Sequence, residues 1–398
     1  LLLSTKHLVA TGHDAIMKPF VPQRLPIQDV NWEPLIPMIG RANRSVALYD
    51  GVLYGVPNPE VLLAPLTTQE AVLSSRIEGT QATLGDVLKF EAGEEPEQES
   101  RRVDILEIIN YRRALLRGEE ALKAKPFNLN LLLELHAILL DSVRGRNKGR
   151  GRFRTTQNWI GTPGTPIERA DFVPPDPTHL KSALDSWEKY YHAERPDSLV
   201  QLAIVHAQFE IIHPFLDGNG RIGRIMIPLF LHEKKLLARP IFYMSAYLEE
   251  HRNEYIARLR ALGTKADAWN QWIAFFLQAL DEQARANTEK ARAIIDLYEK
   301  LKARVLDLTH SQFAVPILDQ IFERPLFQSS DVKFTDGRRP TKQAIGGLLR
   351  ILRENGILEV VRAGRGRRAQ VLAFTELIRL CEARMGGEGS PVGRRKTR

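Results

Sequence analysis

Residues 213–224 read His-Pro-Phe-Leu-Asp-Gly-Asn-Gly-Arg-Ile-Gly-Arg, a short stretch that combines an imidazole, a carboxylate, three glycines and two guanidiniums. An imidazole such as that of His213 has an unperturbed pKa near neutrality and can take a proton from an attacking hydroxyl. The carboxylate of Asp217 offers hard oxygen ligands to a divalent cation, and Arg221 and Arg224 can each bind anionic oxygens in a fork. This set of groups indicates a site that handles phosphate.

Apolar residues on both sides of this stretch follow a helical period. Before it they fall at Leu202, Val205, Phe209 and Ile212, and after it at Ile222, Ile225, Leu229 and Phe230. One helix is therefore expected over 198–212, and a second from about Gly220 or Arg221. Gly218 and Gly220 let the connecting backbone turn tightly. The second helix would point its amino terminus, which can bind anions, back at His213.

The same stretch resembles the signature of the Fic (filamentation induced by cAMP) family, HxFx(D/E)GNGRxxR, at every fixed position. The resemblance implies a Fic-type helical bundle and a nucleotidyltransferase that moves AMP from ATP to a Tyr, Ser or Thr hydroxyl of a target protein. It implies His213 as the general base, Asp217 as the ligand of Mg²⁺, and Phe215 as the anchor of the loop in the core. The implied phosphate-binding residues are Gly218, Asn219, Gly220, Arg221, Gly223 and Arg224.

A second motif lies upstream, where Ser74, Glu78 and Gly79 stand in the sequence LSSRIEGT. It resembles the inhibitory motif (S/T)xxxE(G/N) of self-restrained Fic proteins. The resemblance implies that the Glu78 carboxylate pairs with Arg224 and occupies the space of the ATP γ-phosphate, which would hold activity down. The alternative is a helix cap, since Ser75 and Glu78 also match SxxE, the capping box that begins many helices.

Between the two motifs, the segments 158–161 and 170–175 read as short extended pieces around a turn rich in Gly and Pro. They resemble the hairpin flap by which Fic enzymes hold an extended target segment through strand addition. An ordinary surface hairpin is the alternative. The implied target-binding residues of the flap are Trp159, Ile160, Gly161, Phe172 and Val173. The residues that the resemblance implies for the adenine pocket are Tyr247, Asn253 and Tyr255.

The composition sets the broad class of protein. The chain has 398 residues, enough for two or three domains, and its apolar fraction of 43% is typical of a soluble protein. No apolar run reaches the length of a membrane span, so no membrane partner is expected. Cys381 is the single cysteine, which excludes an intramolecular disulfide and favours a reducing, cytoplasmic location.

The carboxy-terminal part carries the positive charge. Residues 328–398 hold 16 Lys plus Arg against 7 Asp plus Glu, a net charge of +9, whereas the whole chain has +8. A helical pattern over 341–354 is followed by extended segments at 357–361 and 369–374, and this order resembles a winged helix that contacts DNA. A docking or dimerisation domain with a solvated basic wing is the alternative. The arginines near the turn of the hairpin are Arg362, Arg365, Arg367 and Arg368.

These features together predict a mainly α protein: a Fic-type helical bundle with a small β-hairpin flap, followed by a winged-helix-like α+β domain. The expected parts are an amino-terminal helical region with the inhibitory motif (1–90), a Fic catalytic core (101–285), a linker helix (286–310), the winged-helix-like domain (311–384) and a basic disordered tail (385–398).

The predicted function is that of an autoinhibited protein adenylyltransferase with ATP as substrate and Mg²⁺ as cofactor. Expected partners are a target protein with an exposed hydroxyl side chain, the chain itself, a second copy in a homo-oligomer, and DNA through the carboxy-terminal domain. Two alternatives remain open. One is a winged-helix DNA-binding regulator that uses the Fic core as a nucleotide sensor, and the other is a Fic enzyme that removes AMP or transfers another phosphate-containing group.

Overall fold

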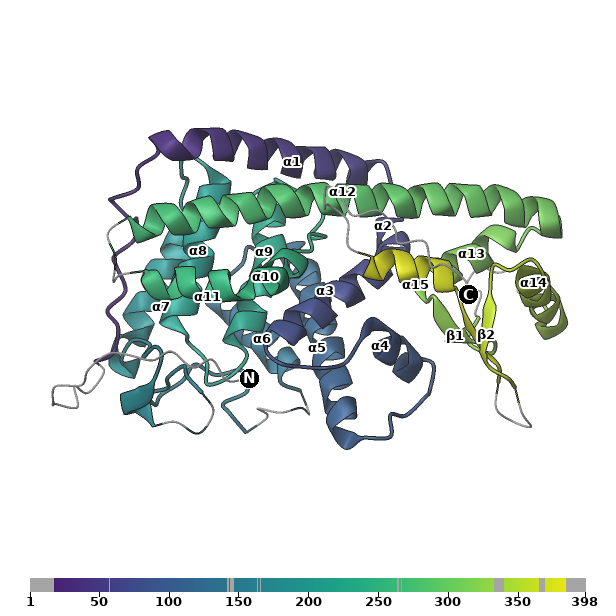
Figure 1. Ribbon diagram of the computed structural model, residues 1–398, viewed down its shortest axis with the longest axis horizontal. Helices are drawn as coiled ribbons and strands as arrows, with labels where there is room; N and C mark the ends of the chain where they lie inside the picture. Colours follow the sequence, from purple (N-terminus) through teal and green to yellow (C-terminus); the bar gives the residue numbers. More distant parts are fainter. Residues whose placement is uncertain are drawn as a thin grey trace, which may run out of the picture.

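The computed structural model describes residues 18–56, 58–141, 143, 147–162, 164, 166–262, 265, 267–332, 340–364 and 369–383. Within these ranges the protein is mainly helical, as the sequence predicted, with one three-stranded antiparallel sheet in the carboxy-terminal part (Figure 1). None of the described helices combines the length and the apolar character needed to cross a membrane.

The helices follow one another along the chain, with the longest connection between α6 and α7. Those before the 213–224 stretch are α1 (Ile36–Tyr54), α2 (Pro59–Leu62), α3 (Ala64–Ile77), α4 (Leu84–Glu91), α5 (Glu99–Leu122), α6 (Leu129–Leu139), α7 (Pro177–His192) and α8 (Ser198–Ile212). Those within and after it are α9 (Asn219–Glu233), α10 (Ser245–Glu250), α11 (Arg252–Ala261), α12 (Ala268–Thr309), α13 (Ala314–Glu323), α14 (Lys342–Glu354) and α15 (Thr375–Glu382). The strands are β1 (Leu326–Gln328), β2 (Glu359–Arg362) and β3 (Val371–Ala373).

Helix α8 lies at the centre of the core, with α7, α9 and α12 packed around it. Nearly all of its residues are buried, because its sequence is apolar on every side and a helix of that kind is stable only when surrounded. The helix begins at the cap residue Asp197, whose carboxylate accepts hydrogen bonds from the backbone N–H groups of Leu199 and Val200 at 2.9 Å. It ends at Ile212, as the apolar period predicted, and so delivers His213 from a rigid element.

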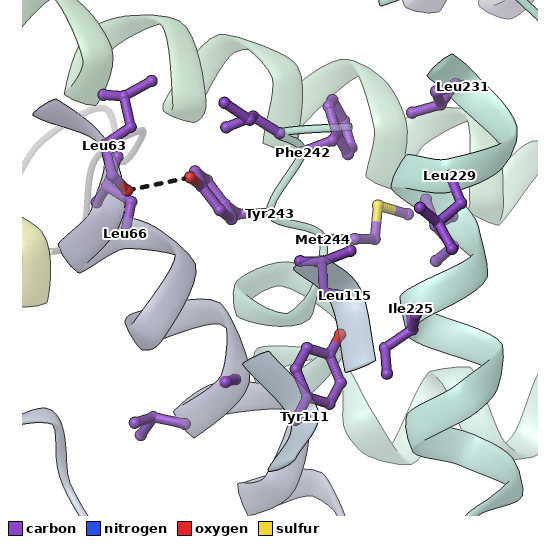
Figure 2. Close-up of a cluster of buried hydrophobic side chains, with 14 of the residues drawn as sticks. Leu63, Leu66, Tyr111, Leu115, Ile225, Leu229, Leu231, Phe242, Tyr243 and Met244 are labelled. Carbon is purple, nitrogen blue, oxygen red and sulfur yellow. Dashed lines mark hydrogen bonds between the residues drawn. The ribbon is translucent and has the colours of Figure 1, made fainter. Parts of the chain in front are cut away.

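Helix α3 carries the upstream motif into this core. The helix contacts α5 and α10, and Figure 2 shows Leu63 and Leu66 in the same apolar cluster as Leu229 of α9. The phenol of Tyr243 donates a hydrogen bond to the backbone oxygen of Leu63 at 3.3 Å. The packing therefore fixes the upstream motif relative to α9.

The capping-box alternative for Ser75 and Glu78 is wrong. Ser75 is buried inside the last turns of α3, whereas a capping residue precedes a helix. The next helix, α4, begins instead with a capping box made by Thr83 and Asp86. Glu78 therefore lies at the carboxyl end of a helix, and its side chain is available for a contact outside that helix.

Helix α12 differs from the expected linker helix over 286–310. It begins at Ala268 and runs for 42 residues along most of the molecule, beside α1 (Figure 1). The prediction placed the start too late, because the apolar period continues unbroken from Trp272 and Phe276 into the second half of the helix. The first half of α12 thus packs against the core, and the second half contacts α13, α14 and α15.

The carboxy-terminal part consists of α13, α14, α15 and a sheet with strand order β1-β3-β2. The expected hairpin is present as β2 and β3, in which Glu359 lies opposite Ala373. Arg362 lies in β2, whereas Arg365, Arg367 and Arg368 and the predicted tail (385–398) lie outside the described residues. We call residues 314–383 the C-terminal module. It contacts the helices that flank Glu78, since α13 and α15 pack on α3 and β1 packs on α4.

Candidate active site

The loop between α8 and α9 is fixed by contacts with its own residues and with the core. Phe215 is fully buried and its ring stacks on that of His136, with 3.7 Å between the centroids. The Asn219 side chain bonds both backbone groups of Phe215, accepting from its N–H and donating to its oxygen at 2.8 Å each. Phe215 therefore has the place expected of a loop anchor, and the Asn219 side chain holds the loop from inside.

A buried arginine that the sequence reasoning missed holds the start of this loop. Arg154 donates from Nε to the backbone oxygen of His213 at 3.0 Å, and from Nη2 to that of Pro175 at 2.5 Å. It thereby joins the loop between α8 and α9 to the end of the flap. Nothing in the local sequence singles it out, because its partners lie far along the chain.

His213 is held as a neutral imidazole with one nitrogen available. Its Nδ1 lies 3.3 Å from the backbone oxygen of Glu210, which can only accept, so Nδ1 carries the hydrogen and Nε2 carries the lone pair. Burial lowers the pKa of His213 to about 4, so the ring is unprotonated at neutral pH. The residue has a left-handed backbone, with φ at 49°, where α8 ends. A neutral imidazole in this setting can accept a proton.

The amino terminus of α9 lies across from His213. Gly218 precedes the helix with φ at +80°, a conformation that glycine adopts without strain. Gly218, Asn219 and Gly220 line the same cavity as His213. The first N–H groups of a helix have no partner within it and can bind anionic oxygens.

Asp217 and Arg221 form a pair at this end of the cavity. Arg221 Nη2 lies 3.2 Å from Asp217 Oδ1, and Arg221 Nη1 lies 3.1 Å from Glu107 Oε2 in α5. Arg221 is buried and does not line the cavity, so the structure does not bring it together with the other predicted phosphate ligands. In this arrangement it orients Asp217, which lines the cavity and lies 3.6 Å from Lys148 Nζ.

The residues present fit a magnesium ion bound mainly by its nucleotide. Among the described residues, no group of three or more His, Cys, Asp or Glu side chains could hold a metal by itself. Mg²⁺ is commonly held by one or two carboxylates together with substrate phosphates and water. Asp217 is partly exposed at the cavity wall and meets that requirement as a single carboxylate.

Arg224 is held by residues of the upstream motif. It is fully buried, and its Nε donates to Ser74 Oγ at 2.8 Å while Nη2 donates to the Ser74 backbone oxygen at 3.0 Å. Nη2 also donates to Glu78 Oε1 at 2.5 Å. Burial alone would raise the pKa of Glu78, but the Arg224 guanidinium outweighs it and holds that pKa below its ordinary value. A side chain at Gly220 would collide with Glu78, so glycine there leaves room for the pair.

These groups surround one cavity of about 660 Å³. Predicted site residues that line it are Glu78, Trp159, Ile160, Gly161, Phe172, His213, Asp217, Gly218, Asn219, Gly220, Arg224 and Tyr255. The predicted residues that are not part of its lining are Ser74, Gly79, Val173, Phe215, Arg221, Gly223, Tyr247 and Asn253. Gly79, with φ at +104°, ends the turn after α3, and Gly223 lets α9 approach Glu210 closely.

The flap is narrower than the two extended segments that were expected. Its pairing is one antiparallel bridge, in which Ile160 N–H donates to Phe172 O at 2.8 Å and Phe172 N–H donates to Ile160 O at 3.1 Å. Proline residues 174 and 175 lack the N–H groups that would extend the pairing. The other edge of the second segment is already bonded, since Phe20 N–H donates to Val173 O at 2.9 Å.

The predicted adenine group is not assembled. Tyr255 lines the cavity, but Tyr247 is buried against His251, and Asn253 lines an adjoining groove on α11 instead of the cavity itself. The chain breaks at His251, where α10 ends and α11 begins, which separates Tyr247 from the other two. Asn253 and Tyr255 stand only two residues apart on α11, so they point to different sides of it. The cavity wall here is formed instead by Ile211, Ile256 and Leu259.

Glu210 is a cavity residue that the sequence reasoning missed. It lies in the last turn of α8, and its Oε1 atom is buried with no hydrogen-bond partner among the described residues. Burial raises the pKa of Glu210 to about 7. An acid with a raised pKa in a cavity is common at functional sites.

Glu210→Gln should stabilise the protein at pH 8 and have a much smaller effect at pH 4. The pKa of Glu210 is raised in the folded state, so its contribution to stability is fully present below the ordinary pKa and is lost as the pH rises through about 7. The amide keeps the shape and carries no charge at either pH. Melting temperatures of parent and variant at both pH values would test this, and an equal difference at pH 4 and pH 8 would contradict it.

Comparisons with known proteins agree with this geometry. Residues 36–120 match the model of the Fic/DOC family N-terminal region, and residues 126–231 match that of the Fic/DOC family. A probable protein adenylyltransferase of Aquifex aeolicus is 28% identical over 206 residues, which cover 50% of this chain and 56% of that protein. The protein adenylyltransferase Fic of Drosophila grimshawi is 33% identical over 106 residues, covering 25% of this chain and 19% of that protein. The matches thus span about half or less of these relatives.

Solved structures share the fold. A Fic family protein from Desulfovibrio desulfuricans superposes with a TM-score of 0.55 at 17% identity, covering 90% of this chain and 98% of that one. Fic-1 from C. elegans superposes with a TM-score of 0.51 at 21% identity, covering 66% of this chain and 75% of that one. The first match extends the similarity over most of the chain.

Proposed function

Because this chain belongs to the Fic family, we propose that it is a protein adenylyltransferase, which transfers AMP from ATP to a hydroxyl side chain of a target protein and of itself. The observation that carries the proposal is one cavity lined by both a neutral His213 and the amino terminus of α9. A base and an anion-binding backbone in one cavity are what attack at a phosphate requires.

The chemistry divides between His213 and the start of α9. His213 Nε2 takes the proton of a Tyr, Ser or Thr hydroxyl as its oxygen attacks the α-phosphorus of ATP. The new bond joins that oxygen to phosphorus, and the bond from the α-phosphorus to the bridging oxygen breaks, so pyrophosphate leaves. The backbone N–H groups at 218–220 donate hydrogen bonds to the phosphate oxygens that carry the developing charge. Mg²⁺, when held by Asp217, would supply further charge neutralisation on the phosphates.

The flap orients the target in this proposal. In an antiparallel pair, neighbouring residues direct their backbone groups to opposite sides. Since Ile160 faces Phe172, the backbone of Trp159 and Gly161 is directed away from that partner. Phe20 occupies the outer edge of the second segment, so a target strand would add beside 159–161. Trp159 is 44% exposed there and lines the cavity.

Glu78 restrains the enzyme by holding Arg224. The pair is short, and the buried Arg224 guanidinium lines the same cavity as the α9 terminus, from which an ATP phosphate chain would extend. A γ-phosphate would have to displace the carboxylate to reach Arg224. ATP then binds weakly or in an unproductive pose until Glu78 withdraws.

Glu78→Gly should increase AMP transfer by about 5- to 150-fold, the usual size of a coupling of this kind. The readout is intact-protein mass after incubation with ATP and Mg²⁺, which registers AMP added to the chain itself. Glu95→Gly is a matched control, because Glu95 is an exposed loop carboxylate whose partner Arg102 lies 3.4 Å away. Adding His213→Ala to the activated chain should abolish the transfer. No gain in Glu78→Gly over the parent would refute the restraint.

Ser74→Ala should also activate the enzyme, though less than Glu78→Gly. It removes the acceptor of Arg224 Nε and loosens α3 on that guanidinium, while Glu78 remains. Ser75→Ala is the control, since Ser75 is equally buried but its hydroxyl has no partner among the described residues. Rates of AMP incorporation would be compared under one set of conditions. Equal rates for the two serine variants would contradict a role of Ser74 in the restraint.

The C-terminal module is proposed as the part that senses a regulator. In this proposal the chain consists of an amino-terminal region, a catalytic core that extends into α12, and a winged-helix-like domain. The module touches both helices that flank Glu78, and Gln328 Nε2 donates to Ala92 O at 2.7 Å beside α4. A ligand of the module, DNA or protein, would therefore act on the segment that carries the restraint.

A further inference from the structure

A basic groove lies beside the cavity and is not used by the chemistry above. It has a volume of about 490 Å³ and is formed by one side of α11 and the residue Lys265. Its lining residues are Arg252, Asn253, Ile256, Ala257, Arg260, Ala261 and Lys265. Three of these described residues are cationic and none is acidic.

The groove is continuous with the active-site cavity. Arg252, Ile256 and Arg260 line both, since they are four residues apart and share one face of the helix. The two arginines also contact two other segments of the site, the end of α3 before Glu78 and the flap. Arg252 Nε donates to the backbone oxygen of Ile77 at 3.0 Å, directly before Glu78, and Arg260 Nη2 lies 2.8 Å from Asp171 Oδ2 in the flap.

Breaking the ion pair between Arg260 and Asp171 costs little free energy. Both side chains are nearly half exposed, at 46% and 47%, and an exposed pair of this kind stabilises a protein by about 0–1 kcal/mol. A second carboxylate could therefore replace Asp171 on the guanidinium. Arg252 uses Nε for Ile77, and a guanidinium has four further N–H donors.

We propose that this groove binds an acidic side chain of the target, so that the enzyme prefers hydroxyl residues with a nearby Asp or Glu. The proposal rests on the proposed function. The ATP phosphates have their own ligands at the α9 terminus and Arg224, whereas the groove opens beside the flap that orients the target. An extended segment advances about 3.3 Å per residue, so an acid about two to four positions from the acceptor reaches the groove from a cavity of this size.

The test is an array of synthetic peptides, each with one Tyr, Ser or Thr acceptor and Asp, Asn, Glu, Gln or Ala at the flanking positions. The array is incubated with Glu78→Gly, Mg²⁺ and labelled ATP. The same enzyme with Arg260→Gln and Lys265→Gln added is compared with one carrying Arg258→Gln. Arg258 is a matched control, because it lies on α11, pairs with Glu254 and does not line the groove.

We expect labelling of acidic peptides to exceed that of their amide counterparts by on the order of tenfold, the size of one charge-assisted contact. The Arg260→Gln and Lys265→Gln enzyme should lose this preference, the Arg258→Gln enzyme should keep it, and added salt should weaken it.

Three results would overturn the inference: equal labelling of acidic and amide peptides, an unchanged preference in the double variant, or an unlabelled array alongside clear self-modification. Self-modification of each enzyme, read by intact mass, separates this failure from that of the proposed function. Loss of both self-modification and array labelling in Glu78→Gly would instead reject the adenylyltransferase itself. A double variant that loses ATP affinity, measured by calorimetry, would assign the groove to the nucleotide.

Discussion

The rest of the site depends on one buried guanidinium, that of Arg224. A buried cation must be paired and hydrogen-bonded, and the partners here come from α3, far along the chain from α9. The same group is suited to a terminal phosphate, which is also a polyanion with several acceptor oxygens. In this structure Ser74 and Glu78 satisfy Arg224 from within the chain, and in the proposed mechanism a productive complex would satisfy it from the nucleotide.

This shared partner links catalysis to the wider fold. Helix α3 is packed on α5 and α10 at the core and on α13 and α15 of the C-terminal module. Withdrawal of Glu78 requires movement of the last turn of α3 or of its side chain, and Arg252 holds the backbone at Ile77. In the proposed mechanism, release of the restraint can thus come from either side of the helix, through the module or through the groove on α11.

The sequence was most informative where the chemistry is local. The turn after His213, the end of α8 and the approximate start of α9 could be predicted, because the motif residues are neighbours and the flanking apolar period is regular. Pairing across the chain was harder. Nothing in the sequence near Arg221 indicates that this buried side chain pairs with Glu107 of α5. Glu210 lines the cavity, but in the sequence it is one polar residue within an otherwise apolar helix. The chain breaks between two helices at His251, and this separates Tyr247 from Tyr255. The apolar period of α12 continues unbroken, so it gave no sign of a separate linker helix that begins at residue 286.

The central claim is that Glu78 and the γ-phosphate compete for Arg224. It is tested most directly by calorimetric affinities of ATP and ADP for His213→Ala and for the same chain with Glu78→Gly, since the first substitution prevents turnover. The account predicts a clear gain in ATP affinity on removal of Glu78 and little change for ADP, which lacks the γ-phosphate. An equal gain for both nucleotides, or no gain for either, would contradict it.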